Sequence, residues 1–415
     1  MQSFGRAVAR AARGVARGGS TPTRLRAWMV GTAVLAVMFG VLAAIGVGRR
    51  DASLGDAHSA SQQLIAVQDV QVRLVHAEAI ARGNYLRGGI ENAADRATYE
   101  TELAAVSNGL VIVGNQVLPN EAAKLATVSA DLGRYAGLVE QARANNRQGY
   151  PIGAAYLRAA NEPLAAMVAT LRDVQVALRH QVNDSLDRAD RAGAWLHLLG
   201  WPLMVVLMIG GGWVALRFRR LVNLPVAVAA GLTLLLLVIG GKVQGSAMTD
   251  AEAATASSLQ AADLAAQARS AAFDAHAQEY STLIARGTTD DTPWQTASAT
   301  ASLALDHLCS TTSSCGLSAV FESYATAHAA VRAADVGGDW DGARASSLDG
   351  AASTSFKSFD TASSSAASDL AQQAASSMST ASNGLGALRV VVFLAGLVVA
   401  ALALAGYGQR LKEYR

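Results

Sequence analysis

"ALRFRRLVNLP", from Ala215 to Pro225, is a short basic stretch between two long apolar segments. "WLHLLGWPLMVVLMIGGGWVAL" precedes it at Trp195–Leu216, and "LPVAVAAGLTLLLLVIGG" follows it at Leu224–Gly241. Neither segment contains Asp, Glu, Lys or Arg, and each is close to the roughly 20 apolar residues that a helix needs to cross a bilayer. The pattern predicts that the chain crosses a membrane, turns within a few residues and crosses back.

Two further segments have the same character. They are "WMVGTAVLAVMFGVLAAIGVG", Trp28–Gly48, and "VVVFLAGLVVAALALAGYG", Val390–Gly408. The composition agrees, because 51% of the 415 residues are hydrophobic and only 16% are charged. We therefore expect four transmembrane helices and a bilayer as the surrounding phase. The net charge of +2 gives no reason to expect a nucleic-acid partner.

The positive charges predict the orientation of the four spans. Three short segments fall on one side of the bilayer: residues 1–27, 217–223 and 409–415. The first carries six arginines and no acidic residue, and the other two hold Arg217, Arg219, Arg220, Arg410, Lys412 and Arg415. Because basic loops stay in the cytoplasm, we expect both termini there, in the plasma membrane. The large segments 49–194 and 242–389 then lie outside, each long enough for one domain.

Both outer segments are predicted to be helical. "LIAVQDVQVRLVHAEAIARGNYL" places apolar residues at spacings of three and four, which is one stripe of a helix. A break follows at "GGIENAADRAT", and "LPNEAAKL" predicts a turn at Pro119 with an N-cap at Asn120. Short connections make consecutive helices antiparallel neighbours. The predicted fold class is an all-α membrane protein with two extracytoplasmic four-helix bundles.

The two outer segments are also predicted to be a tandem duplication. A shift of about 199 residues aligns Gln68 with Gln267 and Gly88 with Gly287, and a shorter gap then aligns Tyr99 with Trp294. "LRGG" and "ARGT" each end the first helix on a glycine. Long bundles of this kind pair side by side. The pair is either a homodimer of two chains or formed by the two segments of one chain, and both arrangements stay open.

The sequence contains little that points to chemistry. The seven histidines are scattered without a metal-ligand spacing, and we expect no metal, no cofactor, no catalytic residues and no enzymatic activity. "DVGGDWDGARASSLDG" lacks the final acidic ligand of a calcium loop and is interpreted as a capped turn. Cys309 and Cys315 flank "STTSS" in the second outer segment, where oxidising conditions favour a local disulfide.

"AIARGNYLRGG", from Ala79 to Gly89, is the candidate for an extracytoplasmic ligand or partner contact. Arg82, Tyr85 and Arg87 offer cationic and aromatic groups for an anionic ligand such as a carboxylate. The alternative is a solvated arginine face with Tyr85 in the core. We favour that alternative, because charged helix faces are common.

The same stretch carries a family resemblance. A long helix that leaves a span and closes on an "RGxYLxG"-like motif resembles the four-helix sensor domains of bacterial chemoreceptors and histidine kinases. The chain departs from those receptors after the second span, where no signalling domain follows. The whole arrangement, with its Arg-rich N-terminus and the tail "GYGQRLKEYR", resembles the GlnX-like family of actinobacterial four-span membrane proteins. That resemblance implies coupling of an extracytoplasmic glutamine-binding lipoprotein to the cytosolic serine/threonine protein kinase G.

The predicted function is a non-enzymatic transmembrane relay. It would sense glutamine, glutamate or aspartate availability through a solute-binding lipoprotein and pass the signal to a cytosolic kinase. The basic groups of 217–223 and 409–415, namely Arg217, Arg219, Arg220, Arg410, Lys412 and Arg415, are the predicted docking surface for the kinase. Two alternatives stay open. One is a receptor that binds a small molecule directly in its outer bundles, and the other is a transporter-accessory or structural envelope protein.

Overall fold

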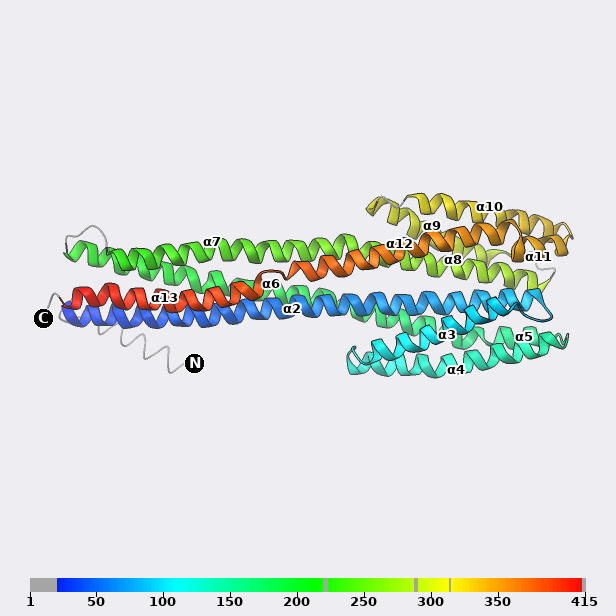
Figure 1. Ribbon diagram of the computed structural model, residues 1–415, viewed down its shortest axis with the longest axis horizontal. Helices are drawn as coiled ribbons and strands as arrows, with labels where there is room; N and C mark the ends of the chain where they lie inside the picture. Colours follow the sequence, from blue (N-terminus) through cyan, green and yellow to red (C-terminus); the bar gives the residue numbers. More distant parts are fainter. Residues whose placement is uncertain (1–20, 219–222, 287–289, 313–314, 413–415) are drawn as a thin grey trace. The chain divides into compact units, whose positions relative to one another are not determined.

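The computed structural model describes residues 21–218, 223–286, 290–312 and 315–412, and it contains only helices over those ranges (Figure 1). The predicted all-α class is therefore confirmed. In chain order the helices are α2 (Thr21–Arg87), α3 (Ala93–Gly114), α4 (Pro119–Arg147), α5 (Gly153–Ala159), α6 (Asn161–Phe218), α7 (Leu224–Ala253), the π-helix η1 (Ala254–Leu259), α8 (Gln260–Ala285), α9 (Thr292–Thr311), α10 (Gly316–Val336), α11 (Trp340–Asp349), α12 (Ala351–Ala381) and α13 (Leu385–Lys412).

The helices divide into two compact units. Unit 1 is built from the chain up to Asp56, from Asp184–Glu252 and from the chain after Met378. Unit 2 is built from Ala57–Asn183 and Ala253–Met378. The predicted spans all fall in unit 1. Unit 2 lies entirely within the predicted outer segments 49–194 and 242–389.

Unit 1 has the surface of a membrane-embedded body. Four helical stretches are long and apolar enough to cross a bilayer, and each contains one predicted span: Thr23–Arg87, Gly153–Leu216, Leu224–Ala285 and Trp340–Leu411. Large apolar side chains are exposed on all four, among them Val30, Leu198, Leu235 and Val390. Water would penalise such a surface, whereas lipid tails cover it without cost. The chain is accordingly a membrane protein with four candidate spans.

Glycines bring the helices of unit 1 close together. A Cβ added at Gly40 on α2 would lie 2.9 Å from the Cα of Gly396 on α13. A Cβ at Gly200 on α6 would meet Leu237 of α7 at 2.5 Å. Small residues at such crossings allow the backbone contact that drives helix association in lipid, where no hydrophobic effect operates between helices.

The Gly40–Gly396 crossing gives a first prediction. Replacing Gly40 with leucine forces a side chain against backbone, and we expect unit 1 to lose about 2 kcal/mol of stability. The matched control is Gly31→Leu on the same helix, because Gly31 is exposed and has no neighbour within 4 Å. Denaturation midpoints of the two purified variants in one detergent provide the measurement. Equal midpoints would show that the crossing does not limit stability.

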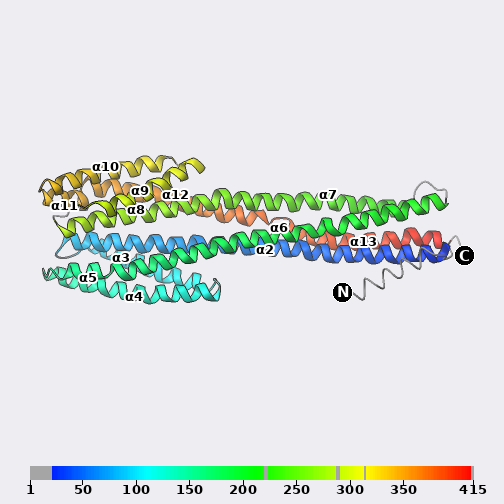
Figure 2. The same ribbon diagram turned by 180° about the vertical axis from the view of Figure 1, so that it is seen from behind.

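Unit 2 has two halves, a first half at Ala57–Asn183 and a second half at Ala253–Met378. Side-chain hydrogen bonds join the helices of the first half. Tyr135 on α4 donates to Glu78 on α2 at 2.5 Å, and Asn146 on α4 donates to the carbonyl oxygen of Tyr85 at 2.9 Å. Arg96 on α3 reaches Glu140 on α4 at 3.4 Å. In Figures 1 and 2, α3 and α4 lie beside α2, whereas α9 and α10 lie beside α8 and α12. The two halves of unit 2 therefore each gather around their own first helix.

Buried positions recur at fixed offsets between the two halves. Four buried residues of α3 and four of α9 are 195 positions apart: Tyr99, Val106, Leu110 and Val113 against Trp294, Ala301, Leu305 and Leu308. Six buried residues of α4 and the six of α10 are 189 positions apart: Val128, Leu132, Tyr135, Val139, Ala142 and Arg143 against Leu317, Phe321, Tyr324, His328, Val331 and Arg332. Helices α3 and α9 thus bury residues at the same relative spacing, and so do α4 and α10.

Two helix ends agree with the prediction from local sequence, and two differ. Helix α2 ends at Arg87, and Gly88 and Gly89 follow with φ of 73° and 64°. Asp339 caps α11 by accepting from the backbone N–H of Gly342, so the turn there is a capped turn. Helix α4, however, begins at Pro119 with Leu118 in the cap position, so the predicted cap at Asn120 is wrong. At the end of α8 the positive φ of 46° belongs to Arg286, and Gly287 lies outside the described residues.

Candidate functional site: the contact and cavities between the halves of unit 2

The two halves of unit 2 meet along α2 and α8. Gln71 donates to Ser270 at 3.0 Å, and Arg82 donates to Ser281; both pairs are 199 positions apart. A Cβ at Gly83 would lie 3.0 Å from the ring of Tyr280, so the two helices approach closely. The separation of 199 positions is the shift at which the sequence predicts a tandem duplication.

Arg82 lies at the centre of this contact and is not a solvated arginine. It is only 6% exposed and forms an ion pair with Glu78, one turn earlier on α2. Its second terminal nitrogen donates to Asn161 of α6 at 2.8 Å. The other oxygen of Glu78 accepts from Tyr135. The guanidinium of Arg82 and the carboxylate of Glu78 are thus bonded to each other and to residues of α4, α6 and α8. A buried ion pair requires such additional hydrogen bonds.

The other two residues of the predicted contact motif have different roles. Arg87 forms a two-pronged pair with Asp349 of the second half, at 2.9 and 3.0 Å. Tyr85 is half-buried, and burial raises the pKa of its hydroxyl. The favoured interpretation of this stretch as a solvated arginine face therefore does not describe Arg82 and Arg87, which join the two halves.

An open cavity of about 960 Å³ lies on one side of the α2–α8 contact. Helices α2, α6, α8 and α9 line it, with polar groups such as Gln71, Arg172, Gln175 and Asp274. Its volume falls within the roughly 300–1,000 Å³ that small-molecule sites occupy. The buried polar groups are paired with each other; Gln175, for example, donates to Gln71 at 2.9 Å.

A second polar cluster is buried inside the second half. Glu279 on α8 is 0% exposed and accepts hydrogen bonds from His328 at 2.7 Å and from Ser347. The other ring nitrogen of His328 faces Asp291 at 3.3 Å. Burial alone would raise the pKa of Glu279, but the hydrogen bond from His328 holds that pKa below its usual range. Sequence reasoning treated the histidines as scattered and missed this network, because its members are 37–68 positions apart.

His276 belongs to the same cluster. Its ring stacks on Phe356 with centroids 3.9 Å apart, and its nitrogens face the hydroxyls of Tyr280 at 2.7 Å and Tyr324 at 3.3 Å. Burial lowers the pKa of this imidazole to about 4, so it is neutral at pH 7. The signal in the sequence is a single histidine between Ala275 and Ala277, which a search for metal-ligand spacings does not detect.

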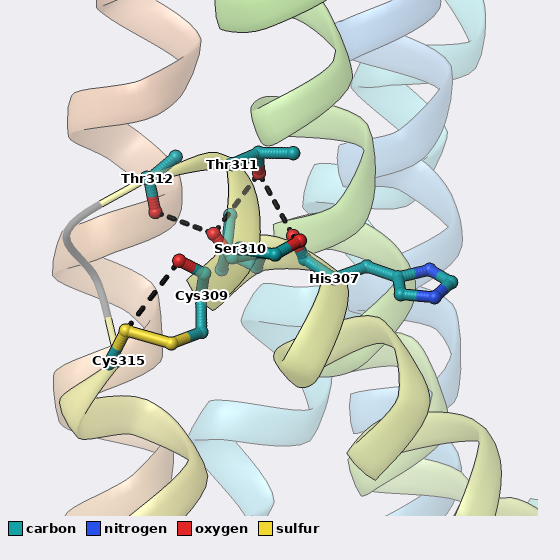
Figure 3. The surroundings of a disulfide bond; sticks show 7 residues. His307, Cys309, Ser310, Thr311, Thr312 and Cys315 are labelled. Atoms are coloured by element: carbon teal, nitrogen blue, oxygen red, sulfur yellow. Dashed lines mark hydrogen bonds between the residues drawn. A yellow bond between two sulfur atoms is a disulfide. The ribbon is translucent and has the colours of Figure 1, made fainter.

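Cys309 and Cys315 form a disulfide between α9 and α10, with Cα atoms 4.4 Å apart (Figure 3). Cys309 is in the last turn of α9, and Cys315 directly precedes α10. The disulfide restrains the α9–α10 connection in the second half. In the first half, the α3–α4 connection has no disulfide, and Pro119 begins α4 there.

The disulfide gives a second prediction. Closing so short a loop restricts the unfolded chain by only about 2 kcal/mol, so Cys309→Ser with Cys315→Ser should lower the stability of the second half by about that amount. Chemical denaturation of the double variant, beside the unreduced and the reduced wild-type chain, measures the loss. A double variant as stable as the unreduced wild type would contradict the prediction.

The residues proposed for cytoplasmic docking are largely not described. Arg219, Arg220 and Arg415 lie outside the described residues, as do the side chains of Arg217 and Lys412. Arg410 is on α13 in unit 1. The structure therefore leaves this part of the prediction as it was.

One segment of the chain has a recognisable family. Residues 53–191 match the actinobacterial sensor domain. This sensor-domain segment runs from α2 through α3, α4 and α5 into α6, and it includes Arg82, Glu78 and Tyr135. No curated protein and no solved structure matches the chain significantly. The match supports an actinobacterial sensor protein, so the prediction of a sensing role is confirmed at that level.

Proposed function

We propose that the chain is a non-enzymatic membrane relay that senses amino-acid availability outside the cell and signals to a cytosolic serine/threonine kinase. The observation that carries the proposal is the position of the sensor-domain segment, which begins beyond the first predicted span and ends before the second. The short basic segments would then face the cytoplasm. The GlnX-like resemblance supports glutamine, glutamate or aspartate as the signal, received through a solute-binding lipoprotein.

The proposal includes a tandem duplication of the sensor. The recurring burial offsets of 195 and 189 positions support it, and so do the two hydrogen bonds between residues 199 positions apart. In this proposal the α2–α8 contact replaces the homodimer contact of a single-copy sensor, with four helices in each half. One chain then suffices for signalling.

The mechanism proposed is a small movement of packed helices. A lipoprotein that binds unit 2 would shift one half against the other at α2–α8. Helices α2 and α6 belong to both units without interruption, so their displacement reaches unit 1. Arg217, Arg219 and Arg220, together with Arg410, Lys412 and Arg415, would present the kinase with a basic surface whose geometry depends on that displacement.

Crosslinking in the native membrane tests the relay. The tagged chain is crosslinked with and without glutamine, and its partners are identified by mass spectrometry. Recovery of a solute-binding lipoprotein together with a soluble kinase is the expected result. Recovery of neither from a folded sample would contradict the relay.

A charge-reversal variant tests the docking surface. Arg217, Arg219 and Arg220 are changed to Glu, and we expect kinase recovery to fall about tenfold while lipoprotein recovery is unchanged. In the control, Arg6, Arg10 and Arg13 are changed to Glu, so the net charge changes by the same amount but in the N-terminal tail. Protease protection of a C-terminal epitope verifies that the orientation is kept. Unchanged kinase recovery would refute docking at this loop.

The cavity of about 960 Å³ favours a second candidate function, direct reception of a small polar molecule. The purified full-length chain would then bind an amino acid without any lipoprotein. Arg172→Gln should weaken that binding, since Arg172 lines the cavity, is exposed and has no ion pair among the described residues. Calorimetry with glutamine, glutamate and aspartate distinguishes the two functions.

A further inference from the structure

The turn that follows α4 recurs, with the same backbone hydrogen bond, after α10. The N–H of Gly149 donates to the carbonyl oxygen of Asn146 at 3.0 Å. The N–H of Gly338 donates to the carbonyl oxygen of Asp335 at 3.1 Å. Both glycines have a positive φ, of 72° and 91°, and they are 189 positions apart, which is also the offset between the buried residues of α4 and α10. The two turns thus allow a comparison of different side chains on one backbone.

The side chains that the two turns expose differ in polarity. Tyr150 and Ile152 lie just after Gly149 and are 55% and 54% exposed. The residues 189 positions later are Asp339 and Asp341, and both are exposed. Because the turn forms with two acidic residues at these positions, its backbone does not require apolar ones. The exposed phenol ring and aliphatic side chain of the first half therefore need another explanation, and a contact with a partner supplies one.

Ile90 lies in the neighbouring turn, between α2 and α3, where it is 91% exposed. Glu91, the next residue, pairs with Arg143 in the last turns of α4 at 2.7 Å, so the α2–α3 turn is bonded to the end of α4. Figures 1 and 2 show the α2–α3 and α4–α5 turns at the same end of the first half. We call Ile90, Tyr150 and Ile152 the turn patch.

Neither lipid nor a second copy of the chain suits the turn patch. Gly48 ends the first predicted span and Arg87 ends α2, and the two are 39 positions apart on one continuous helix. At 1.5 Å per residue this separation is about 58 Å of helix, so lipid does not reach the turn. A stable dimer buries about 800 Å² on each partner, which three side chains do not supply. A small, reversible contact with a different protein fits the patch.

We propose that the turn patch is where the solute-binding lipoprotein of the relay docks, with Tyr150 and Ile152 seated in an apolar recess of that protein. The proposal rests on the relay and deepens it, because it assigns lipoprotein binding to the first half of unit 2. All three residues belong to the segment 53–191 that matches the sensor domain. A few side chains, tyrosine prominent among them, carry most of the binding energy of such a contact.

The proposal also predicts how many lipoproteins one chain binds. The corresponding end of the second half presents Asp339 and Asp341, and Val336 is the one large apolar side chain that its described residues expose. A recess that fits the turn patch would have to bury carboxylates there, which is costly. We therefore expect one lipoprotein per chain, and the mass of the purified crosslinked complex measures this number. Two lipoproteins per chain would overturn the assignment to the first half.

The main variant gives the first half the acidic pair of the second. Tyr150→Asp with Ile152→Asp should leave the unfolding midpoint of the purified chain unchanged, because the same turn forms with these residues after α10. In the native-membrane crosslinking described above, lipoprotein recovery should fall at least about tenfold, whereas kinase recovery should stay at the wild-type level. A lowered midpoint would make the two side chains structural and overturn the assignment.

A second variant adds no charge. Ile90→Ser changes a side chain that is almost fully exposed, so it should not disturb packing. Lipoprotein recovery should fall about threefold, because the substitution removes apolar surface from the patch. Unchanged recovery with Ile90→Ser would overturn the part assigned to this residue.

The matched control changes two apolar residues at the other end of the same half. Ile112 on α3 and Leu118, directly before α4, are 58% and 57% exposed. Figures 1 and 2 show the α3–α4 turn at the opposite end from the turn patch. Ile112→Asp with Leu118→Asp adds the same charge as the main variant and should leave lipoprotein recovery unchanged. An equal loss in this control would assign the effect to charge and overturn the proposal.

The outcomes separate this proposal from the relay. If wild type and the Tyr150→Asp, Ile152→Asp variant recover equal amounts of the lipoprotein, the relay stands and docking at the turn patch is refuted. If wild type recovers no lipoprotein, the relay and the docking site both fail. If the variant keeps the lipoprotein but loses a second, differently tagged copy of this chain, the turn patch is a contact between copies and the proposal is refuted.

Discussion

Arg82→Leu is expected to destabilise unit 2 by about 3–5 kcal/mol. The substitution removes the cation from a buried pair and leaves the carboxylate of Glu78, which is 2% exposed, without its charge partner. It also takes hydrogen bonds away from Asn161 on α6 and from Ser281 on α8, so both the core of the first half and its contact with the second are affected. Denaturant titration of the full-length chain in detergent measures the loss.

Two variants separate the buried pair from arginine loss in general. Adding Glu78→Leu to Arg82→Leu should recover much of the lost stability, because the uncompensated charge disappears and two apolar groups replace the pair. Arg96→Leu removes an exposed arginine of α3 that pairs with Glu100 at the same spacing and also with Glu91 and Glu140. That change should cost less than about 1 kcal/mol. Equal losses for Arg82→Leu and Arg96→Leu would contradict a special role for the buried pair.

Acid is expected to weaken unit 2 well above the usual carboxylate range. The pKa of His276 is lowered to about 4 by burial, against about 6.5 in the unfolded chain. Between these values the unfolded chain binds a proton that the folded chain does not, so stability falls as pH falls from about 6.5 to 4. The contribution is about 3 kcal/mol at most over that window. The lowered pKa of Glu279 extends the loss below the ordinary carboxyl pKa.

The variant that tests this is His276→Gln. Glutamine can still hydrogen-bond Tyr280 or Tyr324 but has no proton to gain, so its stability should vary less between pH 6.5 and 4 than that of wild type. His307→Gln, an exposed position on α9, is the control and should keep the wild-type slope. Tyr280, Tyr324 and Glu279 face His276, and the imidazoles of His76 and His328 also act on its charge. Parallel slopes for wild type and His276→Gln would assign the acid sensitivity to other groups.

The spans and the helix ends could be predicted because each depends on a few neighbouring residues. An uncharged apolar run such as Val390–Gly408 satisfies the requirement of a bilayer by itself. Gly88 predicts a helix end because it takes a positive φ readily. Where two local signals compete, the prediction failed. Asn120 is a good cap, but Pro119 fits the first helical position, and the helix begins there.

The site could not be predicted in the same way, because its residues act through partners far along the chain. Arg82 looks like a surface arginine until Glu78, Asn161 and Ser281 surround it, and Ser281 is 199 positions away. Asn84 shows nothing unusual in the sequence; only the packed structure reveals that its amide is buried without a partner among the described residues. Pair contacts of this kind depend on tertiary packing, which periodicity does not encode.

The four long helical paths differ in mechanical stiffness. Helix α2 has 67 residues and α6 has 58, and each remains one helix through both units. The path from α7 to α8 contains the π-helix η1, and the path from α12 to α13 is interrupted between Ala381 and Leu385, where Gly384 has a φ of 89°. A continuous helix transmits axial displacement and rotation along its length, whereas a π turn or a break is a position where the path can bend. Helix α6 contains Pro202, which is another position where a helix bends. Of the four paths, α2 is thus the one that has no proline, π turn or break after its first turn.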